Sequence, residues 1–231
     1  MKLKGRLELI ARKVPVCNVA VDIGTDHAYI PIYLVKENRC KRAIASDVRP
    51  GPLKIAQKNI KENGLENKID VRLGSGLESI DDSEIDTVVI AGMGGELIIK
   101  ILQDDFEKAK KAKSLILQPM TAISDVRQWL LCNGFDIYDE ELASEGKKIY
   151  TVLCSSWTGE IRNDDIIYYT IGKKLVEKKD PLLKGLIYKK LHKLDMMIEG
   201  LKMSSESENT GKAEKMIEIR ERLKDLLKGL Y

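Results

Sequence analysis

The sequence predicts an α/β fold: a seven-stranded, mainly parallel sheet followed by a helical hairpin. Three observations carry this prediction. Short apolar runs alternate with helical patterns over the first 157 residues, a short loop joins the last two runs, and the composition changes after Trp157. Alternating strands and helices are typical of a doubly wound sheet. A chain of 231 residues has room for one ordinary domain and an appendage.

Seven runs rich in Val, Ile and Leu are the predicted strands. They are almost continuously apolar, as expected where both faces of a strand are covered. They span residues 18–23, 42–47, 69–73, 86–91, 114–118, 134–141 and 148–155. Only a short loop separates the last two, so we expect them to pair antiparallel at the end of the sheet.

Helical patterns lie between these strands, over residues 52–63, 96–103 and 122–133. The first opens with a proline, and glycines stop the first and the last at Gly64 and Gly134. Proline near the start and glycine just past the end are typical of helix boundaries.

The predicted boundary between two domains falls at residue 160. Residues 1–160 form the sheet domain, and residues 161–231 form a second, helical domain rich in Lys, Glu, Leu, Ile and Tyr. Apolar residues repeat at helical spacing on both sides of a polar turn between Gly200 and Gly211. This pattern predicts an antiparallel, coiled-coil-like hairpin. Pro181 is expected to end or kink the helix before it.

Composition excludes several kinds of site. The net charge of +3 is compatible with an RNA partner without requiring one. Four scattered cysteines without a C-x-x-C pattern, and only two histidines, predict no metal site and a reduced, cytoplasmic chain. The sequence has no apolar run of about 18 residues that could span a membrane. The first residues lack the apolar core of a signal peptide.

The most informative motif ends the first predicted strand, Asp22-Ile23-Gly24-Thr25-Asp26-His27. A second acidic residue, Asp47, ends the next strand 23 positions after Gly24. A carboxylate at this distance meets the hydroxyl pair of a ribose in nucleotide-binding sheets.

The same turn lacks both G-x-G-x-x-G and the P-loop pattern, which bind phosphates. It therefore indicates a cofactor with ribose and adenine but no phosphate, a description that S-adenosylmethionine fits. An ordinary parallel strand with a glycine turn is the alternative.

Glycine and polar residues follow each of the first five predicted strands. The segments are residues 22–27, 47, 74–77, 91–95 and 118–120. In an open α/β sheet the ligand lies outside the carboxyl ends of the strands, and glycine lets the backbone approach it closely. The need for turn-forming residues explains any one of these segments. Five such segments at the same edge of the sheet favour a binding site.

The fourth strand ends in Ala-Gly-Met-Gly-Gly, residues 91–95. Many enzymes that methylate exocyclic amines of bases carry N/D-P-P-Y at this place. A ring nitrogen such as adenine N1 has a lone pair, so no proton must leave before methyl transfer. The protein then supplies position and stabilises developing positive charge. Asp26 is the candidate for that catalytic role, and a helix N-cap is its equal alternative.

Four motifs together resemble the bacterial tRNA (adenine-22-N1)-methyltransferase family: residues 22–31, 91–95, 117–119 and 133–135. The resemblance includes the helical tail and covers nearly the whole chain. It implies a Rossmann-like class I methyltransferase domain with a C-terminal coiled coil. It also implies S-adenosylmethionine as methyl donor and N1 of adenine 22 of tRNA as acceptor.

The resemblance also implies cofactor-binding residues: Asp22, Gly24, Thr25, Asp47, Ser75, Gly76 and Gly92. Asp47 would hold the ribose, Ser75 and Gly76 would lie near the adenine, and Gly92 would face the methionine. Two residues depart from the family pattern. Ser75 stands where an acidic residue is frequent, and Met120 stands where Asn is frequent.

Basic residues around the predicted cleft are the candidates for contact with tRNA phosphates. They are Arg6, Arg12, Arg49, Arg127, Lys147 and Lys148. The target base would be drawn out of the RNA and held against Tyr29 or Met93, although Tyr29 also suits a half-buried helix position. We expect a monomer or weak homodimer. A methyltransferase of another acceptor and a non-catalytic RNA-binding protein are the alternative functions.

Overall fold

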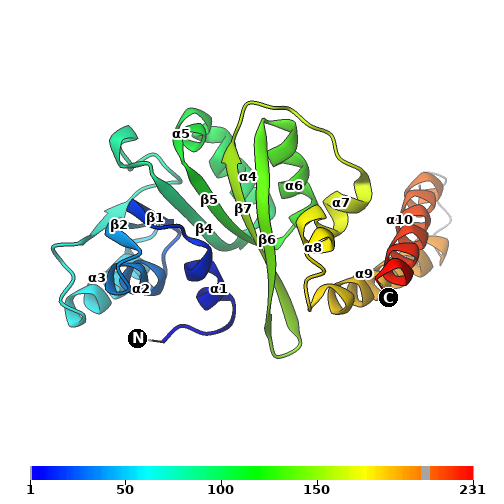
Figure 1. Cartoon of the computed structure of the whole chain (residues 1–231), viewed down its shortest axis with the longest axis horizontal. Helices are drawn as coiled ribbons and strands as arrows, with labels where there is room; N and C mark the ends of the chain where they lie inside the picture. Colours follow the sequence, from blue (N-terminus) through cyan, green and yellow to red (C-terminus); the bar gives the residue numbers. More distant parts are fainter. Residues whose placement is uncertain (1, 204–208, 231) are drawn as a thin grey trace. The chain divides into compact units, whose positions relative to one another are not determined.

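The computed structural model describes residues 2–203 and 209–230 (Figure 1). The chain divides into two compact units, Met1–Asn163 and Asp164–Tyr231. The first contains the sheet and the second contains only helices among its described residues.

The first unit is built on one seven-stranded sheet of order β3-β2-β1-β4-β5-β7-β6 (Figure 1). The strands are β1 (Cys17–Ile23), β2 (Cys40–Asp47), β3 (Ile69–Leu73), β4 (Thr87–Gly94), β5 (Ser114–Thr121), β6 (Phe135–Glu145) and β7 (Lys148–Trp157). The first five are parallel, and β7 pairs antiparallel with both β5 and β6. The predicted seven strands and their antiparallel end are confirmed.

Helices cover both faces of this sheet, which explains the apolar strands: residues 19–23 of β1 are all buried. The helices are α1 (Gly5–Lys13), α2 (Tyr29–Lys36), α3 (Pro50–Glu62), α4 (Gly95–Asp104), α5 (Phe106–Lys111) and α6 (Ile123–Cys132), with a 3-10 turn at Asp82–Glu84. The predicted helices correspond to α3, α4 and α6. Helix α1, which buries Leu9, Ile10 and Ala11, is not among the predicted helices.

The sheet reverses its winding between β1 and β4. From β1 the chain continues outward to β2 and β3, whereas β4 and β5 lie on the other side of β1. The loops after β1 and β4 therefore lead away from each other. Such a switch point leaves a crevice at the carboxyl ends of the strands, where ligands bind in open α/β sheets.

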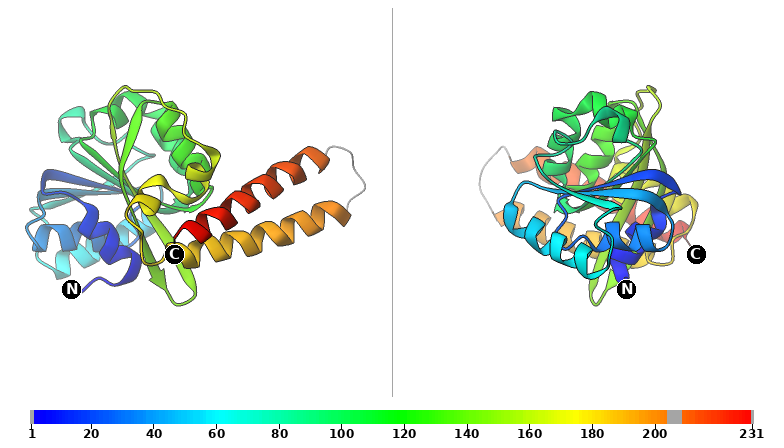
Figure 2. Two further views of the ribbon diagram at one scale, coloured as in Figure 1. Left: turned by 45° about the vertical axis from the view of Figure 1, so that its right-hand side comes forward. Right: turned by 90° about the vertical axis from the view of Figure 1, so that its left-hand side faces the viewer.

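The second unit contains α7 (Ile166–Ile171), α8 (Lys173–Glu177), α9 (Leu183–Met203) and α10 (Asn209–Gly229). Helices α9 and α10 lie side by side as an antiparallel hairpin (Figure 2). Helix α8 ends at Glu177, and Asp180 lies just before α9, where its Oδ1 accepts a hydrogen bond from Leu182 N at 2.8 Å. The predicted break and hairpin are confirmed, while residues 204–208 of the predicted turn lie outside the described residues.

The described residues provide neither a membrane-spanning helix nor a cluster of metal ligands. None of the helices built from them has the length and apolar character that crossing a membrane requires. Across 2–203 and 209–230, no three His, Cys, Asp or Glu side chains gather into a group that could hold a metal ion.

Candidate active site

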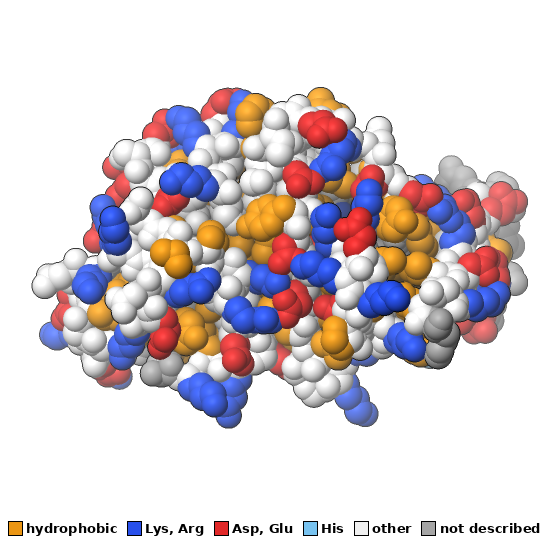
Figure 3. All heavy atoms as spheres, viewed as in Figure 1, with side chains coloured by type: hydrophobic (Ala, Val, Ile, Leu, Met, Phe, Trp, Pro, Cys, Tyr) orange, Lys and Arg blue, Asp and Glu red, His pale blue; other side chains and the backbone are white. Residues whose placement is uncertain are grey.

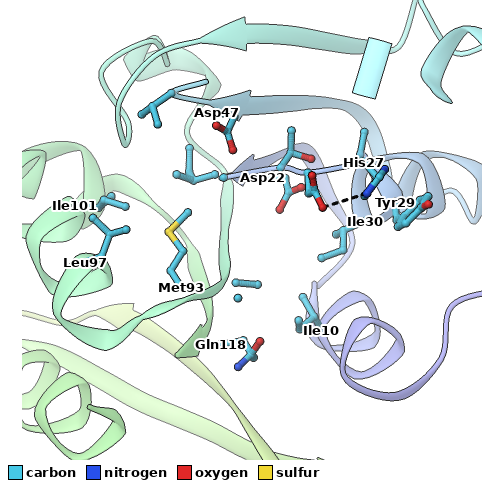
Figure 4. A pocket seen from close by; sticks show the side chains of 18 of the residues that line it. Ile10, Asp22, His27, Tyr29, Ile30, Asp47, Met93, Leu97, Ile101 and Gln118 are labelled. Carbon is cyan, nitrogen blue, oxygen red and sulfur yellow. Dashed lines mark ion pairs between the residues drawn. The ribbon is translucent and has the colours of Figure 1, made fainter. Parts of the chain in front are cut away.

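A cavity of about 690 Å³ opens at the carboxyl ends of β1 to β5 (Figure 4). Its walls come from the turns after these strands and from the N-terminal helix α1. The predicted catalytic and cofactor-binding residues all line it: Asp22, Gly24, Thr25, Asp26, Asp47, Ser75, Gly76 and Gly92. Residues 70 positions apart in the sequence thus meet in one place because parallel strands end at the same edge.

The turn after β1 is fastened to β2. The amides of Gly24 and Thr25 both donate to the carbonyl oxygen of Ser46, at 2.7 and 2.9 Å. Gly24 has a φ of +75°, and a Cβ added there would lie 1.9 Å from Cε of Met93. The backbone conformation therefore favours glycine at this turn, while the flexible end of Met93 could move aside for a larger residue.

Asp22 is a buried carboxyl group at the floor of this turn. Its pKa is raised from 3.8 to about 7, chiefly by burial; the Thr25 side chain lowers the pKa and the nearby charge of Asp47 raises it. Burial disfavours the charged form of an acid, and a nearby cation favours it. Asp22 is therefore poised to ionise when a positively charged group enters the cavity.

Asp47 ends β2. It lines the cavity and is otherwise buried (Figure 4). Its Oδ1 accepts a hydrogen bond from the Arg49 amide at 2.8 Å, and Arg49 Nε lies 3.5 Å from the same oxygen. These contacts hold the carboxylate at the strand end. Its geometry suits a ribose hydroxyl pair, which needs a fixed acceptor.

The turn after β3 contains the predicted residues Ser75 and Gly76. The Gly74 amide donates to the carbonyl oxygen of Asp47 at 3.2 Å, so this turn is attached to the end of β2. From the other side, Asp105 Oδ2 accepts from the Leu77 amide at 2.9 Å. Ser75 is exposed between these two anchors and can offer its hydroxyl to a ligand.

Gly92, at the end of β4, presents bare backbone to the cavity. Its φ is +76°, and a Cβ added there would have nothing within 4 Å. The space that a side chain would fill is therefore available to a ligand, which agrees with the predicted place of this residue in the site.

Asp26 is the most exposed acid of the cavity, with 70% of its side chain accessible. Its Oδ2 lies 3.1 Å from Nε2 of His27 (dashed in Figure 4), and the His27 ring stacks on Tyr29 with centroids 5.0 Å apart. Helix α2 begins at Tyr29, its N-cap is Ala28, and no side chain caps it. The N-cap alternative for Asp26 is therefore wrong, and its catalytic role stays a prediction.

The predicted RNA contacts have different surroundings. Arg6 and Arg49 line the cavity, and Lys147 and Lys148 are exposed where β6 meets β7. Arg12 pairs with Glu141 on β6. On the face drawn in Figure 3, Lys and Arg side chains are intermixed with Asp and Glu.

The prediction for Arg127 is wrong. Its side chain is 3% exposed, and its Nε donates to Glu140 Oε1 at 2.7 Å, with Glu140 itself 1% exposed. A buried ion pair of this kind cannot reach a phosphate on the surface. The apolar face of α6 turns Arg127 inward toward β6, and the periodicity of α6 alone does not reveal the acid that receives it.

Sequence reasoning missed Leu7 and Ile10 as cavity residues. They reach the cavity because α1 packs beside it, and the amphipathic pattern of residues 5–13 was the available signal. Gln118, in the predicted segment 118–120, is fully buried at the end of β5 and lines the cavity. Met120 places its sulfur 3.3 Å from Arg6 Nη1 and 3.5 Å from Gln118 Nε2.

The fold and the site together define a class I methyltransferase. A methyltransferase-domain family model matches residues 3–153, which contain the strand ends described above. The tRNA (adenine(22)-N(1))-methyltransferase of Bacillus subtilis (strain 168) is 32% identical over 98% of both chains.

Two solved structures give the same result. The crystal structure of the B. subtilis m1A22 tRNA methyltransferase TrmK superimposes with a TM-score of 0.88 at 31% identity, covering 98% of this chain and 99% of that one. A putative tRNA (m1A22) methyltransferase of Streptococcus pneumoniae, in complex with S-adenosyl-L-methionine, gives 0.85 at 33% identity, covering 96% and 98%. The chain belongs to the tRNA (adenine(22)-N(1))-methyltransferase family.

Proposed function

We propose that this chain transfers the methyl group of S-adenosylmethionine to N1 of adenine 22 in tRNA. The observation that carries the proposal is the 32% identity, over 98% of both chains, to the B. subtilis enzyme named for this reaction. That similarity includes the helical unit as well as the cavity. A general methyltransferase fold alone would account only for the sheet.

The residues of the cavity fit the cofactor. Asp47 offers a fixed acceptor for the ribose, and the backbone at Gly92 leaves room for the methionine. Asp22 would ionise when the positively charged cofactor binds beside it. Bound S-adenosylmethionine supplies an electrophilic methyl group on a positively charged sulfur. Thr25, Ser75 and Gly76 complete the proposed set.

The chain's own residues then have a limited chemical task. Adenine N1 has a free lone pair at neutral pH, so no general base is required, and positioning dominates. Positive charge develops on the base as N1 is methylated, and the exposed carboxylate of Asp26 supplies a compensating charge at the cavity. The stacked pair of His27 and Tyr29 offers an aromatic surface for the extracted base.

Contacts to tRNA would come from the basic residues already described, the half-buried Arg6 and the exposed Arg49, Lys147 and Lys148. Phosphate contacts of this kind give affinity that falls with salt. We further propose that residues 1–160 act as the catalytic domain and residues 161–231 as a helical accessory domain. The chain would act in the cytoplasm as a monomer or weak homodimer, which light scattering after gel filtration tests.

The test is methylation of unmodified tRNA with labelled S-adenosylmethionine, followed by nucleoside analysis. We expect N1-methyladenosine as the product and no incorporation into the same tRNA carrying guanine at position 22. Cofactor binding without transfer to tRNA, or transfer at another position, would reject the proposal in favour of a different acceptor.

A further inference from the structure

The cavity has two parts, one lined by the turns after β1 to β4 and the other by β5 and α1. The residues proposed for the cofactor follow β1, β2, β3 and β4. The wall formed by β5 and α1 contributes none of them. Its cavity residues are Gln118 from β5, and Arg6, Leu7 and Ile10 from α1. Under the proposed function, this part is the space left for the target base.

Gln118 has a fixed orientation in this wall. Its Nε2 donates to the carbonyl oxygen of Pro119 at 3.0 Å and lies 3.5 Å from Met120 Sδ. A carbonyl oxygen only accepts, so the nitrogen end of the amide must face it and the oxygen end must face the other way. Figure 4 shows that the oxygen is turned toward the cavity and the nitrogen away from it.

The oxygen of this amide needs a donor. Gln118 is fully buried, and Oε1 has no hydrogen-bond partner among the described residues. Buried polar atoms in folded proteins are almost always paired, and a buried atom left unpaired in the wall of a cavity is matched to a ligand that pairs it. The missing partner is therefore a hydrogen-bond donor that enters from the cavity.

We propose that Gln118 determines the choice of base by accepting a hydrogen bond from the exocyclic N6 amino group of the target adenine. This inference rests on the proposed function. N6 is adjacent to N1, so the contact also aims N1 at the methyl group. Guanine carries the acceptor O6 in place of the amino group, and two acceptors facing each other are unfavourable.

The same contact also favours the reaction. When N1 gains the methyl group, positive charge spreads from the ring onto N6, and its N–H becomes a stronger donor. Hydrogen bonds to charged groups are stronger than neutral ones, so the bond to Gln118 Oε1 strengthens in the transition state. Gln118 therefore acts on the rate of methyl transfer more than on the affinity for tRNA.

The test pairs Gln118→Met with a change in the base. Methionine has a similar size and no amide acceptor. The substrates are tRNA with adenine at position 22 and tRNA with unsubstituted purine there, which lacks N6, both assembled by ligation. Gln128→Met is the matched control, because Gln128 is exposed on α6 and away from the cavity.

We expect Gln118→Met to slow single-turnover methylation of the adenine substrate about 10- to 100-fold, the range for one hydrogen bond to a charged group. On the purine substrate the variant and the wild type should react at equal rates. Cofactor affinity and melting temperature should match those of Gln128→Met.

Two results would overturn the inference. An equal loss on both substrates would mean that Gln118 only supports packing at the end of β5. Weakened cofactor binding with no dependence on the base would mean that Oε1 pairs with the cofactor amino group. The wild type on the adenine substrate tests the proposed function separately, since that reaction requires no variant.

Discussion

Asp22 gives a prediction that can be worked through from the structure. Its pKa is raised from 3.8 to about 7 by burial. A raised pKa in a carboxyl group means that the folded protein binds the proton more tightly than the unfolded chain. Stability is therefore lost as pH rises between these two values and is constant above the upper one.

The size of the effect follows from the same values. Between pH 5.5 and pH 8 the wild type should lose about 2 kcal/mol of unfolding free energy relative to Asp22→Asn, at about 1.4 kcal/mol per pKa unit. Asparagine has the same shape and no charge to bury. Because other groups also titrate, the difference between the two proteins is the quantity to measure.

Urea unfolding of both proteins across this pH range is the assay. Asp104→Asn is the control, because that aspartate is exposed on α4 in a surface pair with Lys100 and its removal should shift stability little at any pH. S-adenosylmethionine is a cation and should bind the wild type more tightly as pH rises toward 8, while Asp22→Asn should bind it weakly at every pH. A stability difference that stays flat from pH 5.5 to pH 8 would refute the reasoning.

Three further predictions concern other residues. Asp47→Ala should keep the fold, seen in an unchanged circular dichroism spectrum, and should weaken cofactor binding in calorimetry by at least about tenfold because charge-assisted hydrogen bonds are lost; normal affinity would rule out the ribose assignment. Asp26→Asn should bind the cofactor normally and slow single-turnover methyl transfer about tenfold; an unchanged rate would reject its electrostatic role. Arg127→Met should destabilise the protein by about 3–5 kcal/mol in urea unfolding, since Glu140 is left buried without its partner; a loss of less than about 1 kcal/mol would show that Glu140 is satisfied elsewhere.

The sheet was predictable because its strands are specified by short, local sequence patterns. Strands covered on both faces must be apolar along their length, and the short loop before Lys148 allows only an antiparallel pair. The cavity was predictable for a related reason: Asp22 and Asp47 end parallel strands, so their convergence follows from topology alone.

The remaining features depend on contacts between distant residues. Arg127 looked like a surface cation, but only the three-dimensional position of Glu140 reveals that it is buried. The unpaired acceptor of Gln118 is likewise invisible in the sequence, because it depends on the hydrogen bond that the amide nitrogen donates to the Pro119 carbonyl oxygen. The orientation of a side chain and the burial of a charge therefore could not be predicted from the sequence.

The two hydrogen bonds from the Gly24 and Thr25 amides to the Ser46 carbonyl oxygen have a consequence for the size of the ligand. They join the turn that follows Asp22 to the residue that precedes Asp47, so the two acids keep a constant separation. Under the proposed function, the cofactor contacts both acids, and a homologue of S-adenosylmethionine longer by one methylene should fit only if it loses the contact with one of them. The site would then select its cofactor by length as well as by chemical group.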